Sequence, residues 1–119
     1  MDYAPVSEVS SNYGRQLGSL VISNGNCVEW WRYGSVYRKY TLTHNVFACV
    51  FTRFSNDISN DEVWVCIASE DSVIHSYGTE SGRHYVTGLS IIPTSIKACQ
   101  SQGLVVTSQH NEVQRLFLL

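Results

Sequence analysis

Short apolar runs alternate with clusters of Gly, Asn, Asp and Ser along most of the chain. Runs of this kind, rich in β-branched and aromatic residues and bounded by turn-forming residues, are typical of β-strands. No window carries the i, i+3, i+4, i+7 stripe of an amphipathic helix. The pattern therefore predicts an all-β chain, with strands near residues 19–23, 26–32, 35–41, 46–53, 62–69, 72–77, 84–90, 94–99, 103–107 and 112–118.

Two stretches fall outside this pattern. Residues 1–17 are polar, with Ser, Asn and Gly, and predict a flexible N-terminal lead-in. Residues 54–62, FSNDISNDE, form the most hydrophilic internal stretch and predict an exposed loop. The chain of 119 residues is long enough for one domain with a modest core. We expect that domain to span residues 18–119.

One hairpin pattern recurs along the chain: an aliphatic run ending in Ser, a short polar turn and a second strand. The copies are LVISNGNCVEWW (20–31), VCIASEDSVIHSY (65–77) and LVVTSQHNEVQRLF (104–117). Their serines, Ser23, Ser69 and Ser108, are separated by 46 and 39 residues, close to the roughly 40–45 residues of a four-stranded propeller blade. The repeat predicts antiparallel four-stranded meanders of an incomplete β-propeller with about two and a half WD-repeat-like blades. Because propellers close with about four to eight blades, we expect this chain to need further blades of a longer protein.

Composition and charge narrow the function classes. Apolar residues make up 44% of the chain and charged residues 15%, the balance of a folded protein. The net charge of −2 gives no general attraction to nucleic-acid phosphates or anionic membranes. No apolar run approaches the roughly 18 residues of a transmembrane helix, and the N-terminus lacks the regions of a signal peptide. We therefore expect an intracellular protein that contacts no membrane and for which nucleic acid is an unlikely partner.

The four cysteines are far apart in the sequence. Cys27, Cys49, Cys66 and Cys99 form no C-x-x-C pair, and each lies in or beside an apolar, strand-like run. This spacing favours buried free thiols over disulfides.

One segment contains the residue types of acyl-transfer or acid-base catalysis: Ser69, Glu70, Asp71 and His75. A nucleophile needs its base within hydrogen-bond reach and a third group that orients the base, which proximity along the chain does not provide. Acidic residues between two apolar runs are typical of a hairpin turn. We therefore predict a turn here and no catalytic residue, with a small hydrolase as the weakest functional alternative.

Metal ligands are a second candidate chemistry. The histidines are His44, His75, His84 and His110. Structural zinc sites use closely spaced pairs such as C-x₂₋₄-C or H-x₃₋₅-H, and this sequence has neither. It also lacks the glycine-rich phosphate-binding motifs. We predict no metal ion and no other cofactor.

Residues 30–40, WWRYGSVYRKY, interleave aromatic and cationic side chains. Aromatic rings lined by cations can hold single-stranded nucleic acid. The alternative, which we favour, is a two-stranded hairpin turning at residues 33–35, with aromatic side chains in the core and cationic side chains across the other face. The candidate interaction residues of this segment are Trp31, Arg32, Arg38 and Lys39.

Several of these segments together resemble a known family, the large scaffold subunits of the anaphase-promoting complex, in their amino-terminal propeller region. The segments that carry the resemblance are VEWW, VYRKYTL, VWVCIASEDSVIHSYG and GRHYVTGLSIIPTSIKACQSQGLVVTSQ, within residues 19–109. Their shared features are hydrophobic patterns and turn positions. The Gly-His and Trp-Asp dipeptides of ordinary WD repeats are absent, so the blade prediction rests on periodicity.

The resemblance implies a non-catalytic scaffold in a ubiquitin ligase of the cell cycle that drives mitotic exit. Its partners would be other protein subunits of a large complex, in the nucleus and cytoplasm. The leading hypothesis is therefore a protein-interaction scaffold. The alternative is a small β-barrel that binds single-stranded nucleic acid or a small ligand through residues 30–40.

Overall fold

The computed structural model describes residues 3–7, 17–53, 62–98 and 104–116. All the regular elements within these ranges are β-strands. The strands are β1 (Tyr3–Ser7), β2 (Ser19–Ser23), β3 (Cys27–Arg32), β4 (Ser35–Thr41), β5 (Val46–Arg53), β6 (Val63–Ser69), β7 (Val73–Gly78), β8 (His84–Gly88), β9 (Ser95–Ala98), β10 (Leu104–Thr107) and β11 (Val113–Leu116). The all-β prediction is confirmed. In the described ranges, no helix is present that could cross a membrane.

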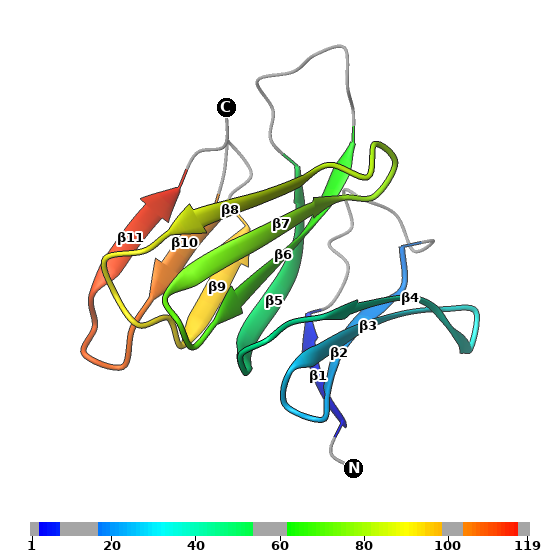
Figure 1. Ribbon diagram of the computed structural model, residues 1–119, viewed down its shortest axis with the longest axis horizontal. Helices are drawn as coiled ribbons and strands as arrows, with labels where there is room; N and C mark the ends of the chain where they lie inside the picture. Colours follow the sequence, from blue (N-terminus) through cyan, green and yellow to red (C-terminus); the bar gives the residue numbers. More distant parts are fainter. Residues whose placement is uncertain (1–2, 8–16, 54–61, 99–103, 117–119) are drawn as a thin grey trace.

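The strands form three antiparallel sheets in which each strand pairs with its neighbours in sequence (Figure 1). The first sheet has the order β1-β2-β3-β4, the second β5-β6-β7-β8, and the third β9-β10-β11. In Figure 1 the first sheet runs from blue to teal, the second is largely green, and the third is orange to red. Each sheet is therefore an up-and-down meander built from one continuous stretch of chain.

The second sheet packs between the other two because both of its faces are apolar. Every residue of β6 is buried. Successive side chains of a strand point to opposite faces, and Val65 and Ile67 accordingly join one hydrophobic cluster while Cys66 and Ala68 join another. The remaining members of these clusters show what covers each face. The first cluster includes Leu20, Val28 and Trp30 of the first sheet, and the second includes Ile96, Leu104 and Val106 of the third.

The expected hairpins are all present, with bounds within one residue of the prediction except that β8 ends two residues early. Residues 117 and 118 of the last expected strand lie outside the described residues. One strand lies inside the polar stretch expected to be a lead-in. The strand β1 pairs with β2 from Tyr3↔Ser23 to Ser7↔Leu20, with an irregularity between Pro5 and Ser7. An edge strand is held by backbone hydrogen bonds, which a polar sequence supplies as well as an apolar one. The loop expected over residues 54–62 lies outside the described residues, apart from Glu62.

Two of the three repeated hairpins share a turn geometry that begins at the repeated serine. In the second and third copies, the carbonyls of Ser69 and Ser108 accept hydrogen bonds from the N–H groups of Ser72 (3.1 Å) and Asn111 (3.2 Å). Ser72 and Asn111 have φ of 61° and 62°, so both turns end with a left-handed residue, as in three-residue hairpin loops with a bulge. The first copy differs, because Asn24 and Gly25 are both left-handed there.

A buried hydroxyl faces a carboxylate in each copy of the repeat. Ser23, Ser69 and Ser108 are buried. Their Oγ atoms donate to the carboxylates of Glu29 (3.4 Å), Asp71 and Glu112 (3.1 Å), respectively. A short side chain that can hydrogen-bond locally suits the end of a strand at a tight turn. Each copy of the sequence repeat is therefore a hairpin with a buried serine bonded to a carboxylate, although the carboxylate lies 6, 2 and 4 residues after the serine in the three copies.

The described strands do not join into one closed sheet. The β-barrel of the alternative hypothesis requires such closure, so it is not supported. The three sheets contain four, four and three strands, which is compatible with the expected meanders. Their interpretation as propeller blades, and the number of blades, stay predictions.

Candidate functional site

The candidate interaction residues lie on the β3–β4 hairpin of the first sheet. Arg32 pairs with Ser35, so the turn consists of Tyr33 and Gly34, with φ of 53° and 81°. Two left-handed residues in a two-residue loop match the twist of antiparallel strands. The turn is therefore one residue shorter than the expected turn over residues 33–35. Beyond it the register shifts between Trp30 and Trp31, which leaves one extra residue on β4.

Trp30 lies in the core, as expected, but the expected placement of the cationic side chains on the opposite face is wrong for Arg32 and Arg38, which lie against the rings of Trp30 and Tyr37. Its side chain is 2% exposed, and its ring packs edge-on against Phe51 of β5 at a centroid distance of 5.5 Å. The indole N–H donates to the carbonyl of Leu17. Tyr37, which is half exposed, packs edge-on against the same indole at 4.8 Å. Trp30 is consequently unavailable as a stacking platform for a base.

Two arginines gather around the exposed ring of Tyr37. The Cζ atoms of Arg32 and Arg38 lie 4.9 Å and 5.4 Å from its ring centroid. These distances are within the range of cation–π attraction. Arg38 also donates from Nη1 to the carbonyl of Thr79 at 2.9 Å. Arg38 therefore ties the edge of the first sheet to the β7–β8 turn of the second, although its side chain stays exposed, whereas Arg32 is partly buried.

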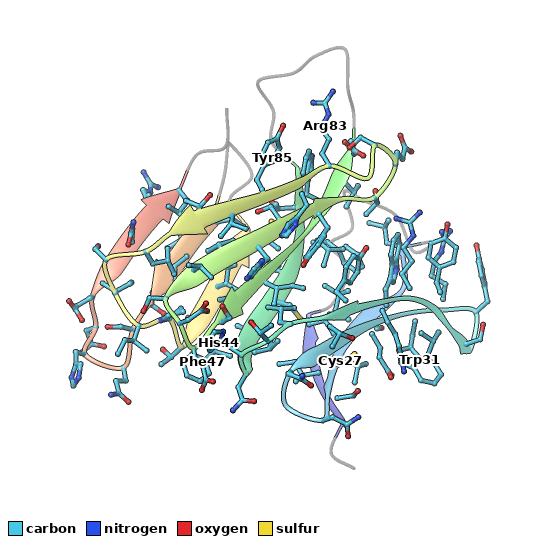
Figure 2. All side chains as sticks on the ribbon, viewed as in Figure 1. Cys27, Trp31, His44, Phe47, Arg83 and Tyr85 are labelled. Carbon is cyan, nitrogen blue, oxygen red and sulfur yellow. The ribbon has the colours of Figure 1, made fainter. Side chains whose placement is uncertain are left out.

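Trp31 and Lys39 lie on the opposite face of the first sheet, around a buried carboxylate. Figure 2 shows Trp31 on the side of this sheet that faces away from the second sheet. The indole N–H of Trp31 donates to Oε1 of Glu29 at 2.9 Å, and Nζ of Lys39 is 3.7 Å from Oε2. Glu29 is 3% exposed, and a buried carboxylate needs such partners.

The four candidate residues thus form two separate groups. Arg32 and Arg38 belong to the Tyr37 side of the hairpin, and Trp31 and Lys39 belong to the Glu29 side. The division follows from strand alternation and the bulge, neither of which is visible in the residue types alone. Glu29 is the member of this arrangement that the sequence did not single out.

The segment with catalytic residue types forms a hairpin turn, as expected. Glu70, Asp71 and Ser72 connect β6 to β7, and both acidic side chains are exposed. The hydroxyl of Ser69 donates to Asp71 and to the carbonyl of Val73 at 3.4 Å. The hydrogen bond from Ser69 lowers the pKa of Asp71 below its usual range. These contacts give Ser69 and Asp71 a role in the turn.

Three cysteines are buried free thiols, as the spacing indicated: Cys27, Cys49 and Cys66. Burial raises the pKa of Cys49 and Cys66 to about 12. A thiol with such a pKa carries almost no thiolate at neutral pH and is a poor nucleophile. Cys99 lies outside the described residues.

The structure also brings together four rings that are separated in sequence. The tilted rings of Tyr40 of β4 and Tyr77 of β7 have a centroid distance of 4.6 Å. Tyr77 stacks on His84 of β8 at 4.3 Å, and His84 lies 5.3 Å from His75. Burial raises the pKa of Tyr40 and Tyr77. The register of the β7–β8 hairpin places His75 beside His84, and this register is the only signal from which the sequence could have indicated the pair.

The comparisons with known proteins give no relative. A scan against protein-family models found no match, and a search of curated proteins found none either.

Proposed function

We propose that this chain is a non-catalytic protein-interaction scaffold, built as part of an incomplete β-propeller. The observation that carries the proposal is the stacking of three consecutive antiparallel meanders through shared hydrophobic clusters. Propeller blades are meanders of this kind, packed face to face around an axis. The resemblance to the amino-terminal propeller of the large scaffold subunit of the anaphase-promoting complex supports the same interpretation.

The relative placement of the first strands supports the blade interpretation. Each sheet begins with a strand at its edge, namely β1, β5 and β9. The strand β5 contacts both β1 and β9. In a propeller, the corresponding edge of every blade lies next to the central channel. In a series of blades, the first strands of successive sheets therefore lie next to one another, as β1, β5 and β9 do.

The last strands of the sheets offer the surface for partners. No residue of β4 is buried, and β8 is largely exposed. Exposed apolar side chains are concentrated on these strands and β11: Val36, Tyr37, Tyr85, Val86 and Val113. Exposed aromatic and aliphatic side chains are typical anchors of protein interfaces. Edge strands also present unpaired backbone groups to a partner.

The partners that this proposal implies are other subunits of a large cell-cycle ubiquitin ligase. The chain would act with further blades of a longer protein, in the nucleus and cytoplasm. No residue is assigned a catalytic role. Arg32 and Arg38 on one face of the first sheet, and Trp31 and Lys39 on the other, are its candidate interaction residues.

Site-specific photo-crosslinking in cells tests the proposal. A photoreactive phenylalanine derivative at Tyr37 or Tyr85 replaces one exposed aromatic ring with another and leaves the core intact. We expect adducts with subunits of the anaphase-promoting complex, identified by mass spectrometry. The same replacement at Phe51, which is 2% exposed, is the matched control and should give only adducts within the chain. Adducts at Tyr37 and Tyr85 that contain no subunit of this complex would contradict the assignment.

A second candidate function, binding of single-stranded nucleic acid, is favoured only by the cation–π group of Arg32, Tyr37 and Arg38. Binding through this group should weaken as salt rises, and Tyr37→Ala should weaken it further by removing a stacking surface. Fluorescence anisotropy with a labelled single-stranded oligonucleotide measures both effects. Unchanged anisotropy on addition of the wild-type chain would exclude this function.

A further inference from the structure

The β7–β8 hairpin carries two histidines whose ring nitrogens face each other. His75 pairs with Val86 across the strands, and Tyr77 pairs with His84. His75 and His84 are therefore diagonal neighbours on one face of the sheet, a separation that long side chains can bridge. Nδ1 of His75 lies 3.1 Å from Nε2 of His84, and the ring centroids are 5.3 Å apart. Because the nitrogens are closer than the ring centres, they occupy the facing edges of the two rings.

This separation matches the span between two ligands of one metal ion. Imidazole nitrogens bind Zn²⁺ at about 2.0–2.1 Å, so two nitrogens on one ion lie roughly 2.9–3.4 Å apart for bond angles between square and tetrahedral values. The observed 3.1 Å falls inside this interval. The two rings are inclined by 21°, so the side chains must rotate for both lone pairs to point at a shared ion.

Neighbouring rings hold His84 in place. The ring of Tyr77 stacks on that of His84 with an interplanar angle of 10°, and Tyr77 is in turn packed against Tyr40 of the first sheet. A ligand held in this way loses less conformational freedom when it binds an ion. His84 is exposed and His75 is half-buried, so an ion from solution can reach the pair.

Two further charged or titratable groups, Asp71 and His44, act electrostatically on the pair. Nδ1 of His44 lies 3.4 Å from Oδ2 of Asp71. The Asp71 carboxylate adds negative charge close to the pair, which favours a cation.

We propose that His75 and His84 form a binding site for one divalent transition-metal ion such as Zn²⁺. Within the described ranges, no group of three or more His, Cys, Asp or Glu side chains could hold a metal ion. The pair therefore supplies two ligands, and water fills the other positions. Imidazole ligands favour Cu²⁺, Ni²⁺ and Zn²⁺ over Mg²⁺ and Ca²⁺, which prefer oxygen. This site is independent of the proposed scaffold function.

Isothermal titration of the full chain with ZnCl₂ at pH 7.5, in a buffer that does not bind zinc, tests the site. We expect one ion per chain and a loss of affinity of about tenfold or more in His84→Ala, because a single imidazole lacks the chelate. His110→Ala removes an exposed histidine of the β10–β11 turn and should leave binding unchanged.

A second measurement locates the ion. In a two-dimensional NMR spectrum of the histidine rings, substoichiometric Ni²⁺ should broaden the signals of His75 and His84 before those of His110. His84 is exposed, so its replacement leaves the packing of the core intact, and melting followed by circular dichroism checks this. Zinc affinity equal in wild type and His84→Ala, or no binding at millimolar zinc, would overturn the proposal.

Discussion

The strands β6 and β4 have the same length and opposite surroundings. All seven residues of β6 are buried, whereas no residue of β4 is. The strand β6 lies in the middle sheet, and its two faces belong to two different hydrophobic clusters. The strand β4 ends the first sheet, with its aromatic and cationic side chains largely exposed. The strand β6 therefore contributes mainly to the hydrophobic core, whereas β4 presents its side chains at the surface of the molecule.

The difference also explains why similar residue types have different roles in the two strands. The serine that closes β6, Ser69, is buried and serves the following turn. Its counterpart at the start of β4, Ser35, is exposed. Burial of β6 fixes each side chain to one cluster, while exposure of β4 leaves Tyr37 and its arginines on the surface. Surface replacements in β4 should therefore alter binding more than stability.

The largest expected effect on the free energy of unfolding comes from a matched pair of valine replacements, one in each strand. Val65 of β6 is fully buried and Val36 of β4 is 39% exposed. Val65→Ala should lower the free energy of unfolding by about 2–3 kcal/mol, through lost apolar burial and the cavity left behind. Val36→Ala should change it by less than about 0.5 kcal/mol. Urea denaturation measures both, and equal losses would contradict the difference between the strands.

A buried carboxylate at the start of β6 gives the second prediction. Oε2 of Glu62 accepts hydrogen bonds from the N–H groups of Glu80 (2.7 Å) and Ser81 in the β7–β8 turn. Burial raises the pKa of Glu62, but these hydrogen bonds outweigh it and lower the pKa overall. Glu62→Gln should cost about 1–2 kcal/mol at pH 7, because a charged acceptor is lost.

The lowered pKa of Glu62 also sets the sign of a pH effect. Its stabilising contribution is fully present above the ordinary glutamate pKa of about 4.3 and is lost as the pH falls through the lower folded value. Denaturation from pH 7 to pH 3 should therefore show a smaller loss of stability in Glu62→Gln than in the wild type. Glu80→Gln, at an exposed side chain of the same turn, is the control. Parallel pH curves for the wild type and Glu62→Gln would refute this role.

The smallest predicted effect lies in the turn that leaves β6. Ser72 has φ of 61°, a left-handed conformation that glycine adopts without steric cost. Ser72→Gly relieves strain in the folded chain, but it also makes the unfolded chain more flexible, which opposes folding. We expect a net stabilisation of about 0.5 kcal/mol. The matched change Ser35→Gly, at the exposed start of β4, should destabilise slightly, because glycine weakens a strand. Thermal melts that give the same sign for both variants would contradict the turn geometry.

Much of the fold could be predicted from short apolar runs bounded by turn-forming residues, since buried strands need apolar side chains and turns need residues that tolerate tight backbone geometry. This pattern located the three serine hairpins and the buried strand β6. It did not indicate β1, whose few residues are held by backbone pairing to β2. Nor could it assign the alternate faces of β6 to two different sheets, because VWVCIAS is apolar at nearly every position.

The candidate site was predicted less completely. Residue types indicated Trp31, Arg32, Arg38 and Lys39, but the bulge at Trp30 and strand alternation divide them between two faces. Spacing along the chain also gave no reason to group His75 with His84, because their proximity depends on the register of one hairpin. The register of a hairpin depends on its turn geometry and on which side chains are buried, and neither is given by residue types alone.

The central claim is that the second sheet lies in the middle of three packed sheets, whereas β4 is an edge strand of the first sheet. Hydrogen exchange of the full chain, followed by mass spectrometry, tests this claim most directly. Amide exchange of a strand reports the free energy of the opening that exposes it. Peptides covering Val63–Ser69 should exchange with the protection of global unfolding, and those covering Ser35–Thr41 should exchange at least about 100-fold faster through local opening. Equal protection of the two strands, or faster exchange in β6, would contradict the account.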